Sequence, residues 1–168
     1  MTRTLVAYGS KRGSTREIAE WVGADLREAG FDVDILPASS VRDVTPYHAV
    51  VLGGALYAAR WHRDARRFAR RYGRVLRDRE VWLFSSGPLD NSAVKREIPP
   101  VRGAALAAER VGARGHMTFG GRLAEDARGF PASSMAKTRA GDFRDTAQVH
   151  AWTAGIVSDL RAEIRGTQ

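Results

Sequence analysis

Residues 5–15 read LVAYGSKRGST. The apolar run Leu5–Tyr8 predicts a buried strand, and an amphipathic helix pattern follows Thr15. The order strand, short polar loop, helix start is typical of an anion site, because hydroxyls, loop N–H groups and the positive end of a helix meet there. This stretch therefore predicts a phosphate-binding loop at the end of a first strand.

The rest of the chain alternates between strand and helix patterns. Further strands are expected at residues 31–35, 49–52, 81–84 and 115–119. Helices are expected at residues 18–29, 61–76, 103–110 and 149–164. Such alternation with short connections predicts an α/β fold, a doubly wound five-stranded parallel sheet in the order 2-1-3-4-5 with helices on both faces.

Several local signals mark where these elements end. Gly53-Gly54 is expected to stop the third strand, and Gly30 stands where a helix C-terminal cap belongs. Asp145 and Gln148 resemble a capping box at the start of the last helix. We expect a single domain over residues 1–168, with an irregular inserted segment at about 120–143. A connection this long inside a compact domain is usually functional or disordered.

Composition narrows the chemistry. The chain has no cysteine, so thiolate catalysis and Cys-based metal sites are excluded, and redox chemistry would come from a bound organic cofactor. The spacing of the four histidines suits no metal motif. No apolar run approaches the ~18–20 residues of a membrane span, and no signal-peptide pattern precedes the first strand. We therefore expect a cytoplasmic protein.

Charge is strongly basic, with 27 Lys and Arg against 19 Asp and Glu and a net charge of +8. Nine arginines lie between residues 60 and 79, mostly on the side opposite an apolar stripe. Such a face could dock an acidic redox partner or an anionic membrane, including the inner face of the cell membrane, or it is simply solvated. Nucleic-acid binding has no support beyond charge, because no binding module is present.

Glycine spacing distinguishes between known phosphate loops. A dinucleotide fingerprint needs Gly-x-Gly-x-x-Gly, whereas this loop has only Gly9 and Gly13. In a Walker A loop the glycines are one residue further apart, and Lys stands where this chain has Ser14. Both patterns fail, which leaves a loop rich in hydroxyls.

Residues 8–15, Tyr-Gly-Ser-Lys-Arg-Gly-Ser-Thr, resemble the FMN-phosphate loop of the flavodoxin family, whose pattern is roughly hydroxyl-x-x-Gly-x-Thr. Two further loops, residues 53–61 and 85–90, fall where that family places flavin contacts. The resemblance covers most of the chain. It implies a flavodoxin-like fold with FMN as the cofactor.

The resemblance also implies which residues contact FMN. They are Ser10, Lys11, Arg12, Gly13, Ser14 and Thr15 in the first loop, Ala55, Leu56, Tyr57 and Trp61 in the second, and Ser86, Gly87 and Pro88 in the third. Hydroxyls of the first loop suit a phosphate, and Gly13 lets backbone N–H groups converge. Ser14 with Glu17 also matches a capping box, which is compatible with phosphate binding.

The ring contacts have alternative interpretations. Tyr57 and Trp61 are candidates for stacking on a flat isoalloxazine, but Trp61 also begins the apolar stripe of a helix and is equally suited to the core. Backbone groups near Gly87 suit the polar edge of the ring. His62 is a candidate proton relay, because histidine titrates near neutral pH.

The same chain is similar to the flavodoxin-type protoporphyrinogen oxidases of bacteria, in the first loop, in Trp61-His62 and in the segment at 120–143. This similarity implies an FMN-dependent oxidoreductase acting on a porphyrinogen and a quinone. Positive side chains suited to propionates or lipid phosphates in that segment are Arg122, Arg128, Lys137 and Arg139. An FMN electron carrier serving a redox partner protein stays open, although ordinary flavodoxins are acidic. A flavin-free interaction domain of the same fold also stays open.

Overall fold

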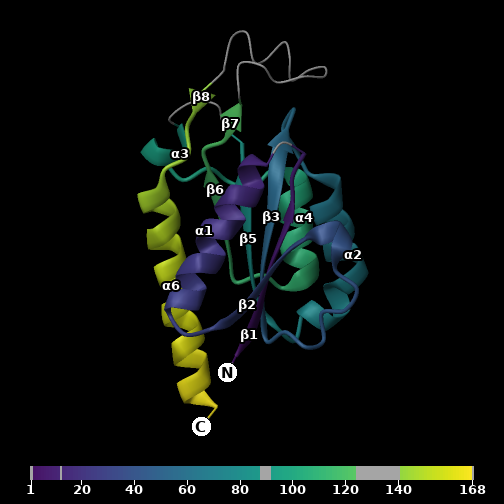
Figure 1. Ribbon diagram of the computed structural model, residues 1–168. Coiled ribbons are helices and arrows are strands. Elements are labelled where there is room, and N and C mark those ends of the chain that lie inside the picture. Colours follow the sequence, from purple (N-terminus) through teal and green to yellow (C-terminus); the bar gives the residue numbers. More distant parts are fainter. Residues whose placement is uncertain (1, 12, 88–91, 124–140, 168) are drawn as a thin grey trace.

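The computed structural model describes residues 2–11, 13–87, 92–123 and 141–167. One parallel sheet runs through the molecule, with helices on either side (Figure 1). Its parallel strands are β2 (Asp32–Pro37), β1 (Arg3–Gly9), β3 (Ala49–Tyr57), β5 (Glu80–Ser86) and β6 (Gly115–Phe119), in that spatial order. The predicted doubly wound sheet and its order 2-1-3-4-5 are therefore confirmed.

Two pairs of helices cover the sheet. One face carries α1 (Ser14–Glu28) and α6 (Thr146–Gly166), and the other carries α2 (Arg63–Leu76) and α4 (Arg102–Val111). Side chains alternate along the strands, so Leu5 packs in the core beside α2 whereas Val6 packs in the core beside α1. Shorter elements are η1 (Ala38–Ser40), β4 (Arg60–Trp61), α3 (Ser92–Lys95), β7 (Arg122–Leu123) and β8 (Gly141–Asp142). Among the described helices, none has the length and apolarity needed to cross a bilayer.

Helix ends follow the sequence signals in two places. Gly30, just beyond α1, has a φ of 97°, the left-handed conformation expected after a helix C-terminus. Asp145 caps α6, because its carboxylate accepts from the N–H groups of Ala147 and Gln148 at 2.9 and 3.3 Å. In a full capping box the Gln148 side chain would bond back to the N–H of Asp145. Here its amide instead donates to the carbonyl of Ala93 at 2.7 Å.

The predicted end of the third strand is wrong. β3 continues through Gly53 and Gly54 to Tyr57. The glycines make room rather than end the strand, because a Cβ on Gly53 would lie 2.1 Å from the ring of Phe84. A Cβ on Gly54 would lie 2.4 Å from the indole nitrogen of Trp61. Two aromatic side chains thus pack directly on the backbone of β3.

The extension of β3 forms a hairpin with β4. Leu56 pairs with Trp61 and Tyr57 with Arg60, and the turn residues Ala58 and Ala59 have φ angles of 50° and 60°. Two consecutive positive φ values match a type I′ turn, which normally recruits Asn or Gly. An L-residue pays roughly 1–2 kcal/mol for this conformation. The hairpin is therefore held by its surroundings rather than by turn propensity.

The base of the inserted segment is a short antiparallel pair. β7 and β8 pair through Arg122 with Asp142 and Leu123 with Gly141, and residues 124–140 lie outside the described residues. The predicted residues Arg128, Lys137 and Arg139 belong to that range. The predicted FMN contacts Arg12 and Pro88 also lie outside the described residues.

Arg144 fixes this base to α1. Its side chain is only 5% exposed, pairs with Asp142 at 2.9 Å and with Glu17 at 3.2 Å, and lies 4.8 Å from the centre of the Trp21 ring. The carboxylate partners raise the pKa of Arg144, so the guanidinium stays charged although it is nearly buried. The inserted segment therefore begins and ends beside the first turn of α1.

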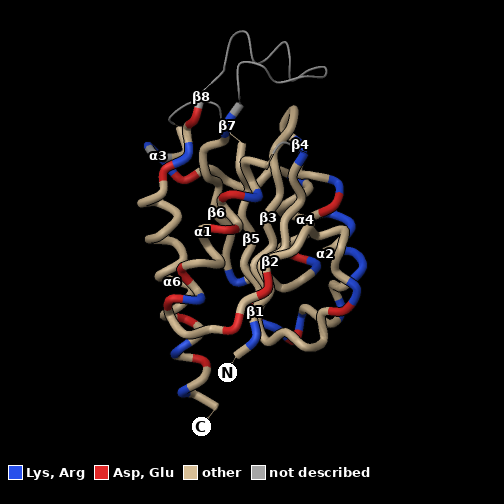
Figure 2. Tube along the Cα trace, viewed as in Figure 1, with Lys and Arg blue, Asp and Glu red and all other residues tan. Residues whose placement is uncertain are grey.

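Positive charge gathers on the outer side of α2 (Figure 2). The exposed arginines of this basic face are Arg63, Arg67, Arg70, Arg71, Arg74 and Arg77. The opposite side of the helix is buried, with Ala65, Phe68 and Leu76 in the core. The predicted division of this helix into an apolar and a basic side is confirmed.

Candidate functional site

A cavity of about 610 Å³ lies at the carboxyl ends of β1, β3 and β5. This volume is within the range of about 300–1,000 Å³ that is usual for cofactor and small-molecule sites. All three predicted loops contribute to it. The predicted residues in its lining are Ser10, Lys11, Ser14, Thr15, Ala55, Leu56, Tyr57, Trp61, Ser86 and Gly87.

The first loop has the features of a phosphate site. Gly13 has a φ of 84° and is the N-cap of α1, but no side chain caps that helix. The hydroxyl of Ser10 accepts from the N–H of Gly13 at 3.1 Å, which folds the loop back on itself. The first N–H groups of α1 therefore remain uncapped by side chains at a position where a helix attracts anions.

The Ser14 hydroxyl supports the same conclusion. Its oxygen is buried and has no hydrogen-bond partner within the described residues. The predicted capping box with Glu17 is wrong, because Ser14 is already inside the helix and Glu17 pairs with Arg122 and Arg144 at 3.4 and 3.2 Å. A buried hydroxyl without a partner is costly, and a phosphate oxygen would satisfy it.

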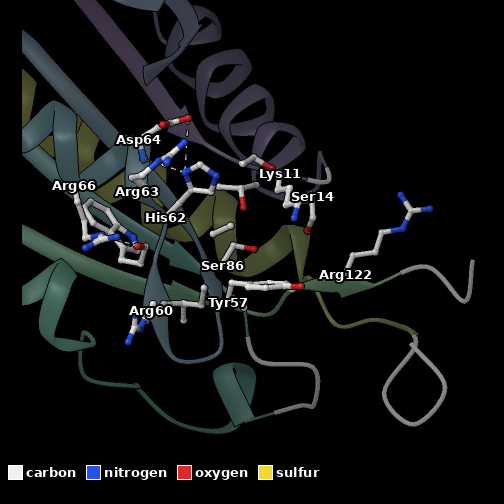
Figure 3. A pocket seen from close by; sticks show the side chains of 17 residues that line it. Lys11, Ser14, Tyr57, Arg60, His62, Arg63, Asp64, Arg66, Ser86 and Arg122 are labelled. Atoms are coloured by element: carbon white, nitrogen blue, oxygen red, sulfur yellow. Dashed lines mark hydrogen bonds and ion pairs between the residues drawn. The ribbon is translucent and has the colours of Figure 1, made fainter. Parts of the chain in front are cut away.

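Tyr57 and Lys11 connect the first two loops. The ammonium of Lys11 lies 5.8 Å from the centre of the Tyr57 ring, within cation–π range. In Figure 3 the flat ring of Tyr57 extends across the cavity, with Ser86 and Ser14 nearby. Tyr57 thus offers an aromatic surface beside the phosphate loop, on which a flat flavin ring can stack.

Trp61 belongs to the core as well as to the cavity wall. It is 1% exposed, packs in the cluster with Ala65 and Phe68, and donates its indole N–H to the carbonyl of Phe84 at 3.3 Å. Both alternatives for this residue therefore describe part of what the structure contains. Stacking of Trp61 on a flavin stays a prediction.

The end of β5 forms the inner side of the cavity. Ser86 is 3% exposed, and the N–H of Gly87 donates to the carbonyl of Phe119 at 3.1 Å. That bond occupies one of the backbone donors considered for the flavin edge. Gly87 is also closely packed, since a Cβ there would lie 2.4 Å from the Cβ of Leu56.

His62 stands at the junction of the second loop and α2. Its Nδ1 accepts from the N–H of Asp64 at 3.1 Å and caps α2, and its ring lies against Gly9. Burial lowers the pKa of His62, and the neighbouring Asp64 opposes this shift only in part. The ring is therefore neutral near pH 7 and carries its proton on Nε2, because Nδ1 is an acceptor.

Sequence reasoning missed several charged residues of the lining. They are Arg60, Arg63, Asp64 and Arg66. Gly121 and the predicted Arg122 border the cavity as well. The nine-arginine stretch was visible in the sequence, but only the hairpin and the start of α2 bring three of these arginines to the cavity. This placement depends on the turn at Ala58 and Ala59, which carries no sequence signal.

FMN fits this constellation. The uncapped start of α1 and the buried hydroxyl of Ser14 suit its phosphate, and Tyr57 suits its ring. The charged side chains around the cavity are mostly positive, which favours a phosphorylated over an unphosphorylated flavin.

Comparisons with known proteins point the same way. A flavodoxin-domain family model matches residues 5–139. Protoporphyrinogen IX dehydrogenase (quinone) of Escherichia coli strain K12 is 23% identical over 96 residues, which cover 56% of this chain and 53% of that protein. The match thus spans about half the length of that curated relative.

Solved structures share the fold. A flavodoxin variant from Pseudomonas aeruginosa is 12% identical, with a TM-score of 0.62 over 95% of this chain and 99% of that one. Oxidised flavodoxin 1 from Bacillus cereus is 14% identical, with a TM-score of 0.63 over 94% and 98%. Rubredoxin:oxygen oxidoreductase from Desulfovibrio gigas is 12% identical, with a TM-score of 0.66 over 98% of this chain and 37% of that one. This chain therefore belongs to the flavodoxin-domain family of FMN-binding redox proteins.

Proposed function

We propose that this protein is an FMN-dependent oxidoreductase that removes hydrogen from a porphyrinogen and passes the electrons to a quinone. The observation that carries the proposal is a cavity in which a phosphate loop, an aromatic wall and a rim of arginines meet. The match to a protein named protoporphyrinogen IX dehydrogenase (quinone) supports it. For each pair of electrons and protons that leaves the porphyrinogen, one quinone becomes one quinol.

The side chains that line the cavity have different roles in this proposal. Bound FMN supplies reversible acceptance of electrons. Ser10, Ser14 and Thr15 hold the phosphate end, and Leu56 with Tyr57 gives an apolar wall that keeps water from the reacting ring. His62 is neutral near pH 7 and holds its proton at Nε2, so it can donate a hydrogen bond from that nitrogen to a bound group.

An anaerobic assay tests this proposal. The FMN-saturated protein is mixed with protoporphyrinogen IX and a menaquinone analogue, and porphyrin fluorescence is followed. We expect porphyrin to form only when protein, FMN and quinone are all present. Porphyrin formation at the uncatalysed rate would refute the proposed activity.

An electron carrier is the second candidate, because the flavodoxin structures are covered over 98–99% of their length by this chain. A carrier would be reduced by a flavodoxin reductase and would reduce an acceptor protein without forming porphyrin. The porphyrin assay and an assay of reduction by a flavodoxin reductase therefore separate carrier from enzyme. A colourless protein that takes up no added FMN would contradict both and favour a flavin-free interaction domain.

The quinone acceptor has a consequence for location. Quinones dissolve in membrane lipid, so this proposal brings the protein to the inner face of a membrane, where the basic face of α2 would meet anionic headgroups. We expect sedimentation with phosphatidylglycerol vesicles but not with phosphatidylcholine vesicles. Equal sedimentation with both would contradict this electrostatic contact.

A further inference from the structure

The cavity carries more positive charge than a phosphate loop needs. Lys11, Arg60, Arg63, Arg66 and Arg122 border it, against the carboxylate of Asp64. Figure 3 separates these cations into two groups: Lys11 and Arg122 lie toward Ser14, whereas the three others lie beyond His62 and Ser86. The second group, Arg60, Arg63 and Arg66, is called here the α2-side arginines.

Arg122 and the α2-side arginines differ in how their charge is balanced. Arg122 is paired with Glu17 at 3.4 Å, on the side of the cavity that holds the phosphate loop. Within the described part of the chain, none of the α2-side arginines forms an ion pair with a carboxylate. The nearest acid in sequence, Asp64, has its carboxylate 3.9 Å from the imidazole of His62. The α2-side arginines thus keep their charge for an incoming anion.

Their backbone positions are fixed even though their charges are not paired. Arg60 lies in the hairpin opposite Tyr57, and Arg63 is the first residue of α2 after the His62 cap. Arg66 donates its Nε–H to the carbonyl of Trp61 at 3.1 Å, and its side chain packs on Gly103. Three cations therefore border one side of a wall formed by Leu56, Tyr57 and Trp61.

We propose that Arg60, Arg63 and Arg66 form a carboxylate-binding subsite for an apolar substrate that carries acidic side groups. The inference rests on the proposed function, and it assigns to these arginines the propionate groups of the porphyrinogen. The macrocycle occupies the part of the cavity that FMN leaves open, and its carboxylates reach the arginines. Guanidinium groups suit this role because they bind carboxylates through two parallel hydrogen bonds.

The test compares a charged and an uncharged form of the same macrocycle. The full-length protein is saturated with FMN, and binding of protoporphyrin IX and of its dimethyl ester is measured by fluorescence. The variant is Arg60→Gln with Arg63→Gln, since both side chains are exposed and Arg66 is tied to the fold. The control is Arg70→Gln with Arg74→Gln, which removes the same charge from exposed positions of α2 outside the cavity.

We expect the dissociation constant of the diacid to rise about tenfold in the Arg60/Arg63 variant and less than about twofold in the control. The ester should bind more weakly than the diacid and respond to neither variant. Equal losses in variant and control, or ester binding as tight as that of the diacid, would overturn the subsite.

The outcomes also separate this subsite from the proposed activity. Diacid binding that depends on Arg60 and Arg63 without porphyrinogen oxidation would refute the activity and keep the subsite. Oxidation with a KM that is unchanged in the variant would keep the activity and refute the subsite. Failure of the wild-type protein to bind the diacid would refute the subsite, whatever the assay of the activity shows.

Discussion

Two helices of this protein begin in opposite ways. α6 is capped by its own sequence, since the carboxylate of Asp145 accepts from two of the first N–H groups. α1 begins at Gly13 with no side-chain cap, and the Ser14 hydroxyl beside it is buried without a partner among the described residues. α6 borders no described part of the cavity, whereas α1 starts in its wall.

The difference shows how a helix terminus becomes a binding site. A capped end satisfies its donors internally and gains stability of about 1 kcal/mol. An uncapped end gives up that stability and keeps its donors for a ligand. α2 is intermediate, because its cap is the ring of His62, a residue that also lines the cavity.

The strongest test places a permanent negative charge at the open end. Ser14→Asp removes a hydroxyl and puts a carboxylate where the phosphate is expected, so the dissociation constant of FMN should rise about a hundredfold. Riboflavin, which lacks the phosphate, should change by less than about twofold. Flavin fluorescence titration measures both. An equal loss for both ligands would contradict the assignment of this loop to phosphate.

Gly13→Ala tests the conformation of the open end. The φ of 84° is strained for alanine, so we expect the free energy of unfolding to fall by about 1–2 kcal/mol. The matched control is Gly30→Ala at the other end of α1, where φ is 97° and a Cβ also meets open space. Urea unfolding should show similar losses, but only Gly13→Ala should weaken FMN binding. Weaker FMN binding in both variants would mean that the affinity for FMN does not depend specifically on the conformation of the loop at Gly13.

Asp145→Ala tests the capped end. Loss of its two backbone hydrogen bonds should lower the free energy of unfolding by about 1 kcal/mol and leave the affinity for FMN unchanged. Chemical denaturation and flavin titration provide the two readouts. A clear change in FMN affinity would show that the two helix ends are not independent.

His62→Asn addresses the intermediate end and should have the smallest effect. Burial lowers the pKa of His62 below its ordinary 6.5, so the unfolded chain takes up the proton first as the pH falls. The stability present above pH 6.5 is therefore lost as the pH falls through the folded-state pKa. Asn caps helices without titrating, so the variant should lose less stability on acidification.

Thermal unfolding between pH 7.5 and about pH 5 measures this difference. His116, whose pKa burial lowers to about 4, is present in both proteins and cancels in the comparison. Parallel pH profiles of wild type and variant would rule out a titrating cap at α2.

Much of the fold was accessible from the sequence because its signals are local. Hydrophobic periodicity identified the parallel strands and the four long helices, and their alternation implied the strand order. The phosphate loop was also visible, since hydroxyls and a glycine follow a strand and precede a helix.

The remaining features depend on residues far apart in the chain. Gly53 and Gly54 resemble a strand terminator until Phe84 and Trp61 are seen to fill the space above them. Glu17 resembles a capping residue in the sequence, but in the structure it forms an ion pair with Arg144, which is distant in the chain. A local sequence pattern cannot reveal such contacts between distant residues. Both sets of contacts lie in segments that border the cavity.

The paired base of the inserted segment has a consequence for how this family can diversify. Residues 124–140 are joined to the domain through the adjacent strands β7 and β8, which Arg144 ties to α1. When the two ends of a segment already lie together, each doubling of its length raises the entropic free-energy cost of closing the loop by only about 0.6 kcal/mol. The stretch between β7 and β8 can therefore change in length or sequence while the pairing of these two strands and the central sheet stay intact.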